Sequence, residues 1–268
     1  MEGKVKKPMR DLKQLAAQFE EQGYLSVENV LNEAEVLALR VGAERLVERA
    51  HGLTESTDRF MIKAFGSGGG GLVQQVAEPH EMGGEWMALA RDPRILDIVE
   101  ALLGPNIMLY YSMFMMKPPR QGFTAPWHQD FAFFAHNRAR LLACQLYVDD
   151  STLENGCIKV VPGSHKLGLQ NHYDGEKFTS KVEGDVSRFD AQALAVPMKA
   201  GGMVIWHSLT LHASDPNRSE RPRRGIVFEY KDPSVSLLSG SFNSSLEVRT
   251  VGLMMRGKDP NGHLLSAP

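Results

Sequence analysis

The sequence predicts a mainly β fold with flanking α-helices, an antiparallel barrel or sandwich. Helical patterns end near residue 104, and from residue 107 onward short apolar strands follow one another with Pro, Gly and Asn clusters between them. The absence of helical patterns among these strands is typical of an antiparallel barrel or sandwich. The length of 268 residues suits one such domain. We expect a single domain over 1–268, with helical support over about 12–104 and a barrel core over about 105–256.

The composition is that of an ordinary soluble globular protein, with 43% hydrophobic and 23% charged residues. The formal net charge of −2 gives no reason to expect binding to nucleic acid or to an anionic membrane. The stretch Met1 to Gln14 lacks the apolar segment of a signal peptide, and no apolar run is long enough to span a bilayer. We therefore expect a cytoplasmic protein. Cys144 and Cys157 are expected to be small buried side chains rather than a disulfide framework.

The N-terminal part of the chain carries helix signals. Apolar residues at helical spacing over 12–22, followed by Gly23, predict a first helix. A short strand is expected over 24–27. Asn32 and Glu35 form a capping-box pattern, which predicts the start of a second helix.

A third helix is predicted to begin at the N-cap Asp92, with Pro93 in its first turn, and to end at Gly104. The glycine-rich run 66–71 is expected to be a flexible loop, and it lacks the Gly-Lys-Ser/Thr continuation of a phosphate-binding loop. The strands predicted after the third helix are 107–117, 141–148, 158–161, 203–211, 225–230 and 247–255.

The tripeptide His128-Gln129-Asp130 is the most informative motif. On an extended chain, residues i and i+2 point to the same side, so this imidazole and this carboxylate can bind one ion. A second histidine from a distant strand would complete a 2-His-1-carboxylate triad, which leaves positions open on Fe(II). The motif alone is common by chance, so the third ligand decides the interpretation.

Several other histidines are candidates for that ligand. His136 and His172 lie in polar segments and are expected to be solvated, and His165 is expected to be a turn residue. His207, in an apolar stretch, is expected to be a hydrogen-bonded core histidine. His212 lies where the apolar run gives way to polar residues, a position typical of a barrel rim at which ligands bind. We predict His212 as the third ligand and keep His207 as the alternative.

An arginine follows His212 at the start of the next predicted strand. Arg223 comes 11 positions later (223 − 212), and a hairpin of that length would bring its guanidinium back towards the metal. A guanidinium can bind a carboxylate through two parallel hydrogen bonds. Strand alternation sends Arg223 and Arg224 to opposite faces, so one of them is expected to face inward.

In these residues the chain resembles the phytanoyl-CoA dioxygenase (PhyH) family of Fe(II)/2-oxoglutarate-dependent oxygenases. The resemblance spans about residues 12–230, and its motifs come in the family's order and spacing. They are Gly-Pro-Asn-Ile-Met (104–108), Lys-Pro-Pro (117–119), His-Gln-Asp (128–130), Asn-Gly-Cys (155–157), Pro-Gly-Ser-His-Lys (162–166), and His212 with Arg223. The resemblance implies a double-stranded β-helix, a jelly-roll, cupin-like barrel with iron at one mouth.

The resemblance also implies roles for particular residues. The implied iron ligands are His128, Asp130 and His212. Arg223 would anchor the distal carboxylate of 2-oxoglutarate, and Met113 and Leu146 match positions that line the cosubstrate site. A family member compared with this chain has Trp where Leu146 stands. It also has a Lys on an early strand, for which the region 72–75 is the nearest counterpart here.

The implied activity uses Fe(II), 2-oxoglutarate and O2. It would hydroxylate, or otherwise oxidise, an aliphatic carbon of a small lipophilic or acyl-type substrate and release succinate and CO2. Aromatic and methionine residues around the His-x-Asp motif are either core packing or the wall of an apolar pocket. Two alternatives remain, a cupin-like isomerase or hydrolase that does not use 2-oxoglutarate and a barrel that only binds a ligand. Bound iron and succinate production separate them.

Overall fold

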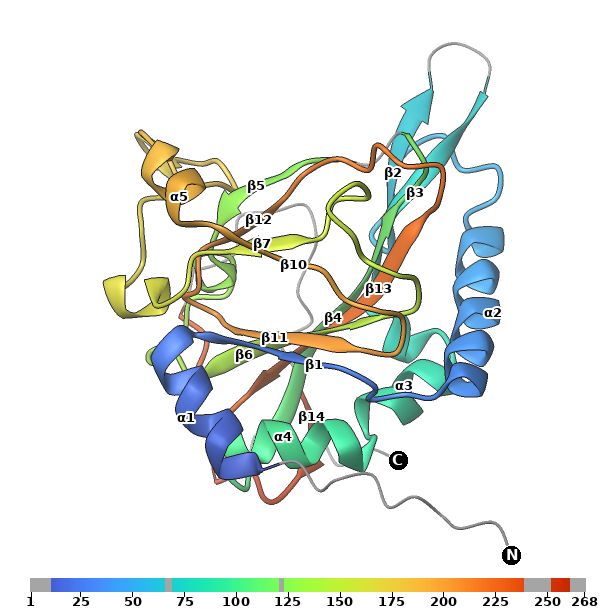
Figure 1. The fold of residues 1–268 in the computed structure, drawn as a ribbon. Coiled ribbons are helices and arrows are strands. Elements are labelled where there is room, and N and C mark those ends of the chain that lie inside the picture. The colour runs from blue at the N-terminus through green and yellow to red at the C-terminus, as the bar shows by residue number, and fades with distance from the viewer. Residues whose placement is uncertain (1–10, 66–68, 121–122, 239–251, 261–268) are drawn as a thin grey trace, which may run out of the picture.

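Two facing antiparallel sheets form the centre of the computed structural model, which describes residues 11–65, 69–120, 123–238 and 252–260 (Figure 1). The large sheet contains β1 (Tyr24–Val27), β2 (Phe60–Phe65), β3 (Gly69–Ala77), β4 (Ile107–Lys117), β6 (Leu141–Tyr147), β11 (Met203–His207), β13 (Arg223–Lys231) and β14 (Leu253–Arg256). The small sheet contains β5 (Ala125–His128), β7 (Ile158–Val160), β10 (Leu194–Val196) and β12 (His212–Ser214). A two-stranded hairpin contains β8 (Tyr173–Asp174) and β9 (Lys177–Phe178).

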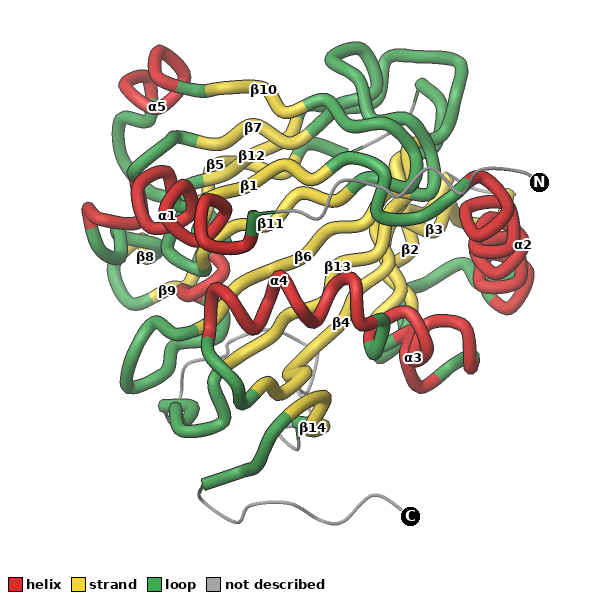
Figure 2. The backbone as a smooth tube through the Cα atoms, turned by 60° about the horizontal axis from the view of Figure 1, so that its bottom comes forward, coloured by secondary structure: helices red, strands yellow, loops and turns green. Residues whose placement is uncertain are grey.

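The strand order places the long strands in the middle of the large sheet. That order is β1-β11-β6-β13-β4-β3-β2, with β14 also paired to β4, and the small sheet runs β10-β7-β12-β5. Four helices lie against the outer face of the large sheet (Figure 2). They are α1 (Leu12–Gln22), α2 (Glu33–Arg49), α3 (Gly84–Ala90) and α4 (Pro93–Leu103), while α5 (Ser187–Gln192) lies by the small sheet.

The helix ends follow the predicted signals. Asn32 accepts a hydrogen bond from the Glu35 backbone N–H, and the Glu35 carboxylate accepts one from the Asn32 N–H, which confirms the capping box of α2. Asp92 caps α4 with Pro93 in its first turn. Gly23 ends α1 at φ 74°, a left-handed conformation that favours glycine. These helices therefore begin and end where the sequence indicates.

Strand alternation divides the large sheet into two packed faces. Along β6, Cys144 and Leu146 pack with the helices on the outer face. Ala143 and Tyr147 pack on the inner face with apolar residues of the small sheet, and Gln145 lines a cavity there. This alternation decides which side chains reach the space between the sheets.

The N-terminal part is less helical than predicted, because β2 and β3 form a hairpin that joins the large sheet through β4. Of the predicted loop 66–71, residues 66–68 lie outside the described part of the chain, whereas Gly69–Gly71 belong to β3. A Cβ on Gly71 would lie 1.8 Å from Ile62 Cγ2. Glycine here permits close packing of two strands rather than loop formation.

Two strands in the C-terminal half differ from the prediction. The strand expected over 203–211 ends at His207, and a turn then leads into β12 at His212. Of the strand expected over 247–255, residues 247–251 lie outside the described part, and β14 covers Leu253–Arg256. The sequence also did not predict α3, α5 or the short strands β8, β9 and β10.

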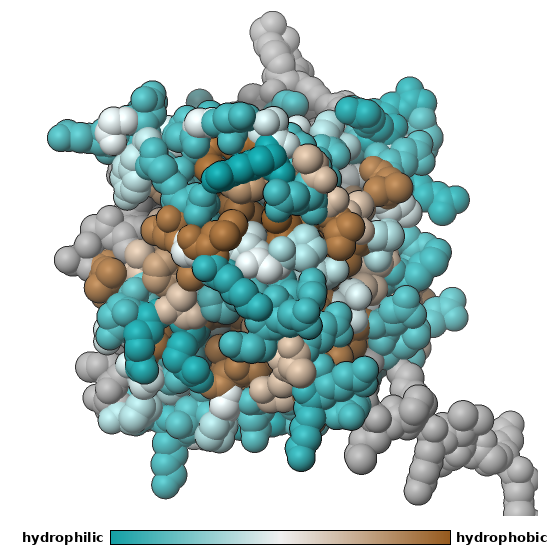
Figure 3. Space-filling model, turned by 60° about the vertical axis from the view of Figure 1, so that its left-hand side comes forward, coloured by the Kyte–Doolittle hydropathy of each residue, from teal (hydrophilic) through white to brown (hydrophobic). Residues whose placement is uncertain are grey.

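The surface mixes polar and apolar side chains. Figure 3 shows apolar patches separated by polar residues on one side of the molecule, and large exposed apolar side chains include Leu167, Leu169 and Leu194. Scattered exposure of this kind is usual for a folded protein. Cys144 and Cys157 are both free and buried, as predicted. Among the described helices, none combines the length and the apolar character needed to cross a bilayer.

Trp86→Ala is expected to lower the free energy of unfolding by about 3–5 kcal/mol. Trp86 is 1% exposed, and its ring packs edge-on against Phe114 of β4 with centroids 5.0 Å apart. Truncation would leave a cavity between α3 and the sheet, which urea denaturation would measure. The control Leu37→Ala, at a 60% exposed position, should change stability by less than about 0.5 kcal/mol. Equal losses in the two variants would contradict this role of Trp86.

Candidate metal and cosubstrate site

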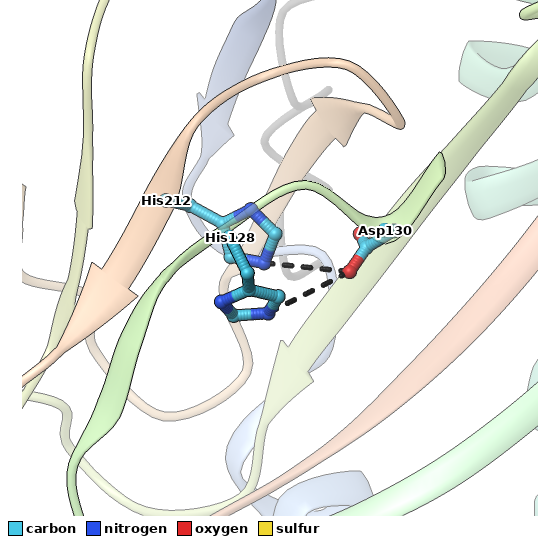
Figure 4. Close-up of side chains that lie close together, drawn as sticks. All are labelled: His128, Asp130 and His212. Atoms are coloured by element: carbon cyan, nitrogen blue, oxygen red, sulfur yellow. Dashed lines mark ion pairs between the residues drawn. The ribbon is translucent and has the colours of Figure 1, made fainter. Parts of the chain in front are cut away.

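Three predicted ligands converge between the sheets (Figure 4). His128 ends β5, Asp130 begins the short 3-10 turn η2 (Asp130–Ala132), and His212 begins β12 directly opposite His128 in the β12–β5 ladder. Asp130 Oδ1 lies 3.5 Å from His212 Nε2 and 3.8 Å from His128 Nε2, and the three potential ligand atoms lie within 4.8 Å of one another. A first-row metal ion at about 2.1 Å from each atom fits this spacing.

Hydrogen bonds orient both imidazoles. His128 Nδ1 bonds to the Pro126 carbonyl at 2.7 Å, and His212 Nδ1 bonds to the Thr210 carbonyl at 3.0 Å. A carbonyl only accepts, so each Nδ1 carries the proton and each Nε2 lone pair faces Asp130. Burial, and then the neighbouring His212, lower the pKa of His128 well below its usual range. The imidazole is therefore neutral, as a metal ligand must be.

The carboxylate of Asp130 is held from the large sheet. Trp206 of β11 donates its indole N–H to Asp130 Oδ2 at 2.6 Å. The other oxygen, Oδ1, then faces the two histidines. The donor set of two imidazoles and one oriented carboxylate is that of a facial triad for Fe(II).

The remaining candidate histidines lie elsewhere. His207 faces the outer side of β11, where its ring lies 5.4 Å from that of His165. His136 and His172 are buried, which corrects the expectation that they are solvated. The Nε2 of His172 accepts a hydrogen bond from the Gln129 backbone N–H at 3.1 Å. His172 thus holds the backbone of the metal motif in place.

An open cavity extends from the triad between the two sheets. Its apolar lining includes Met113, Met115, Ile158 and Val227, and its polar lining includes Lys117, Gln145, Arg223 and Glu229.

Arg223 is 3% exposed and faces this cavity. One of its terminal nitrogens donates to the Gly156 carbonyl at 2.9 Å, whereas its Nε has no hydrogen-bond partner among the described residues. A buried guanidinium with a donor to spare suits a carboxylate ligand. Arg224 faces the other side of β13 and pairs with Asp149 at 2.7 Å. Strand alternation thus turns Arg223 inward and Arg224 outward.

The two other predicted cosubstrate residues, Met113 and Leu146, lie on opposite faces of the large sheet. Met113 lines the cavity. Leu146 does not line it and packs in the core under the helices instead, because its neighbour Gln145 occupies the inner face of β6. The region 72–75, the nearest counterpart of an early-strand lysine, lies in β3 towards the edge of the sheet.

The lysine that does reach the cavity is Lys117, which the sequence indicated only as part of the Lys-Pro-Pro motif and without a role. It is 1% exposed at the end of β4, opposite Arg223. Its Nζ donates to Ser214 Oγ at 2.7 Å and to the Asp215 carbonyl. Burial, and then the charge of Arg223, lower the pKa of Lys117 to about 7. The signal was its even spacing from Met113, which places both residues on one face of the strand.

Glu229 is a cavity residue that the sequence had not singled out. It is 2% exposed and lines the cavity from β13. Burial, and then the nearby Asp130, raise the pKa of Glu229 well above its usual range. Its even spacing from Arg223 was the signal, since both residues then face inward on one strand.

The chain matches the family model described as phytanoyl-CoA dioxygenase (PhyH) over residues 19–225. The chain belongs to this family, the iron- and 2-oxoglutarate-dependent dioxygenases that the motifs predicted. It is 27% identical over 220 residues to a probable alpha-ketoglutarate-dependent hypophosphite dioxygenase of Stutzerimonas stutzeri, covering 80% of this chain and 76% of the relative. It is 26% identical over 249 residues to the peroxisomal phytanoyl-CoA dioxygenase of Homo sapiens, covering 88% and 73%.

Solved structures share the fold. The epimerase SnoN in complex with Fe3+, alpha ketoglutarate and nogalamycin RO has a TM-score of 0.68 and 27% identity, with coverage of 92% of this chain and 96% of that chain. EctD from S. alaskensis with bound Fe has a TM-score of 0.71 and 22% identity, with coverage of 91% and 84%. The predicted family and fold class are confirmed.

The free energy of unfolding is expected to rise with pH above 7 because of Lys117. Its pKa is about 7 in the folded protein but has the ordinary value of 10.5 in the unfolded chain. Between these values the unfolded chain binds the proton and the folded protein does not, so a higher pH favours folding. Lys117→Met should make stability less dependent on pH between about 7 and 9 in urea denaturation. The exposed-site variant Lys63→Met should keep the wild-type slope, and an unchanged slope in Lys117→Met would contradict the assignment.

Proposed function

We propose that this protein is a dioxygenase that hydroxylates, or otherwise oxidises, an aliphatic carbon of a small molecule while 2-oxoglutarate is converted to succinate and CO2. His128, Asp130 and His212 would hold Fe(II). The observation that carries the proposal is the convergence of these three ligands in a cavity that also presents the buried guanidinium of Arg223. When bound, the iron supplies the redox chemistry that couples O2 to oxidation of the cosubstrate and the substrate.

The residues of the chain bind and orient the reactants. Arg223 takes the distal carboxylate of 2-oxoglutarate through paired N–H donors, and the Lys117 amine adds a hydrogen-bond donor beside it. Trp206 and the backbone carbonyls near the histidines hold the ligand atoms in their orientation. Burial strengthens each of these charge interactions relative to water.

Apolar side chains line the cavity beside the metal ligands and favour a lipophilic part of the substrate. Met113, Phe131 and Phe133 are partly exposed hydrophobic residues that pack against one apolar cluster, and the Phe133 ring lies edge-on to His128 with centroids 5.9 Å apart. Apolar walls next to a metal suit an aliphatic substrate or acyl-type chain. By their names the relatives act on compounds as different as phytanoyl-CoA and hypophosphite, so the proposal names a class and not a compound.

The rival function is a cupin-like isomerase or hydrolase that uses the metal without 2-oxoglutarate. Such an enzyme has no need of a buried guanidinium and a buried lysine at one end of the metal cavity. Arg223 and Lys117 therefore favour the dioxygenase.

The test of function is a screen of lipophilic and acyl-type compounds with Fe(II), 2-oxoglutarate and O2. We expect succinate release that increases with a substrate. His212→Ala should abolish iron binding and succinate release, because it removes one of three protein ligands. His207→Ala, which changes a histidine on the outer side of β11, should retain both. The reverse result would make His207 the ligand and would remove the basis of the proposal.

Arg223→Ala should leave iron binding nearly intact but weaken 2-oxoglutarate strongly. Removal of one partner of a buried charge pair costs roughly 2–5 kcal/mol, which is roughly 30-fold to a few thousandfold in affinity. Isothermal titration calorimetry on iron-loaded protein under nitrogen measures this change. Arg221→Ala, at an exposed position close to Arg223 in the chain, is the control. Equal affinities in the two variants would exclude Arg223 as the carboxylate anchor.

A further inference from the structure

Glu229 is a buried carboxyl that the metal and cosubstrate residues leave unused. It is 2% exposed and lines the cavity. Within the described part of the chain, no hydrogen bond or ion pair to its carboxyl is found, and the charged group that influences it is the acidic Asp130. A buried carboxyl without a partner costs free energy. Because the Glu229 carboxyl borders a cavity, a ligand bound there can supply the missing hydrogen-bond or charge partner.

The position of Glu229 separates it from the cosubstrate. Glu229 lies six residues beyond Arg223 on the same face of β13 (229 − 223), which is roughly 20 Å along an extended strand. In the sheet register Glu229 lies opposite Ala143, and Ala143 lies opposite Trp206, which holds Asp130. The iron ligands are thus beside the Glu229 end of the cavity. A cosubstrate that runs from the iron to Arg223 leaves this end open.

The neighbourhood of Glu229 is aromatic, and it includes the buried hydroxyls of Tyr110 and Tyr111. A cluster on this side contains buried Tyr110, Tyr111 and Phe134, with Phe131 and Phe133 partly buried against it. Burial, and then the charge of Glu229, raise the pKa of Tyr110, which places its hydroxyl within the electrostatic range of the carboxyl. A ligand for this end therefore needs an apolar body and one group that donates to a carboxyl.

The charges of the site point to a nitrogen as that donor. The formal charges of Fe(II), Asp130, 2-oxoglutarate and Arg223 cancel. Lys117 belongs to the opposite end of the cavity, where it bonds to Ser214. The anionic form of Glu229 therefore needs a positive partner from a ligand, because burial and Asp130 both disfavour its charge. An ammonium group supplies both the charge and the N–H donors.

We propose that Glu229 determines substrate specificity by binding the amine or ammonium group of an otherwise apolar substrate, so that an aliphatic carbon of that substrate lies next to the iron. The inference rests on the proposed function and narrows its lipophilic substrates to those that carry a basic nitrogen.

The test compares hexylamine with hexan-1-ol, two probes of the same chain length, by isothermal titration calorimetry on protein loaded with Fe(II) and 2-oxoglutarate under nitrogen. The wild-type protein should bind hexylamine at least about 30-fold more tightly than hexan-1-ol. Glu229→Gln, which has the same shape and no charge, should remove this preference and leave hexan-1-ol binding within about threefold. Glu48→Gln, on the exposed face of α2, should keep the preference.

The proposal is overturned if hexylamine binds wild-type protein no more tightly than hexan-1-ol, or if Glu229→Gln retains the preference. The wild-type comparison stands even if the variant does not fold. A failure of the proposed function has a different signature, because Fe(II) and 2-oxoglutarate then do not bind in the same calorimeter before any probe is added. In that case the probes are titrated into metal-free protein, where Glu229 still lines the cavity and the same preference must hold.

Discussion

The pairing of β12 with β5 is the constraint on which the site depends. β12 has three residues, and His212 lies opposite His128 in this ladder. The same short strand brings Ser214 to Lys117 at the other end of the cavity. Because side chains alternate along a strand, a slip of one residue would turn His212 away from Asp130 and Ser214 away from Lys117. The register of this one ladder therefore fixes the positions of a metal ligand and of the Lys117 end of the cosubstrate site.

The central strand β13 connects stability with function. Its outward residues Ile226 and Phe228 are fully buried in the core beneath the helices, and its inward residues Arg223 and Glu229 face the cavity. Burial of charged groups costs free energy unless they find partners, and the large apolar core on the outer face offsets that cost. Buried charged residues are unusual in a protein core and are expected at functional sites. Here they lie on a strand whose outward side chains are fully buried.

Much of the site could be predicted from spacing and alternation. The His-x-Asp spacing identifies His128 and Asp130, and the end of an apolar run identifies His212. Side-chain alternation along β13 requires that either Arg223 or Arg224 face inward. Glu229 is an even number of residues from Arg223 on the same strand, so its inward position could also have been predicted. The face of Leu146 could not be predicted, because its strand is buried on both sides and shows no polar alternation. The burial of His172 was also hidden, since it depends on the Gln129 N–H, which is distant in the sequence.

The two ends of the cavity carry groups of opposite charge, and this difference can determine where each ligand binds. Arg223 forms a cationic end, where Lys117 adds a hydrogen-bond donor, whereas Glu229 forms an acidic end near the aromatic cluster. A dicarboxylate is attracted to the first end and repelled by the second, and an ammonium compound has the reverse preference. The opposite charges at the two ends therefore orient both molecules, through repulsion as well as attraction. The iron ligands lie beside the Glu229 end, so a cosubstrate held at Arg223 extends towards the metal and a substrate held at Glu229 lies next to it.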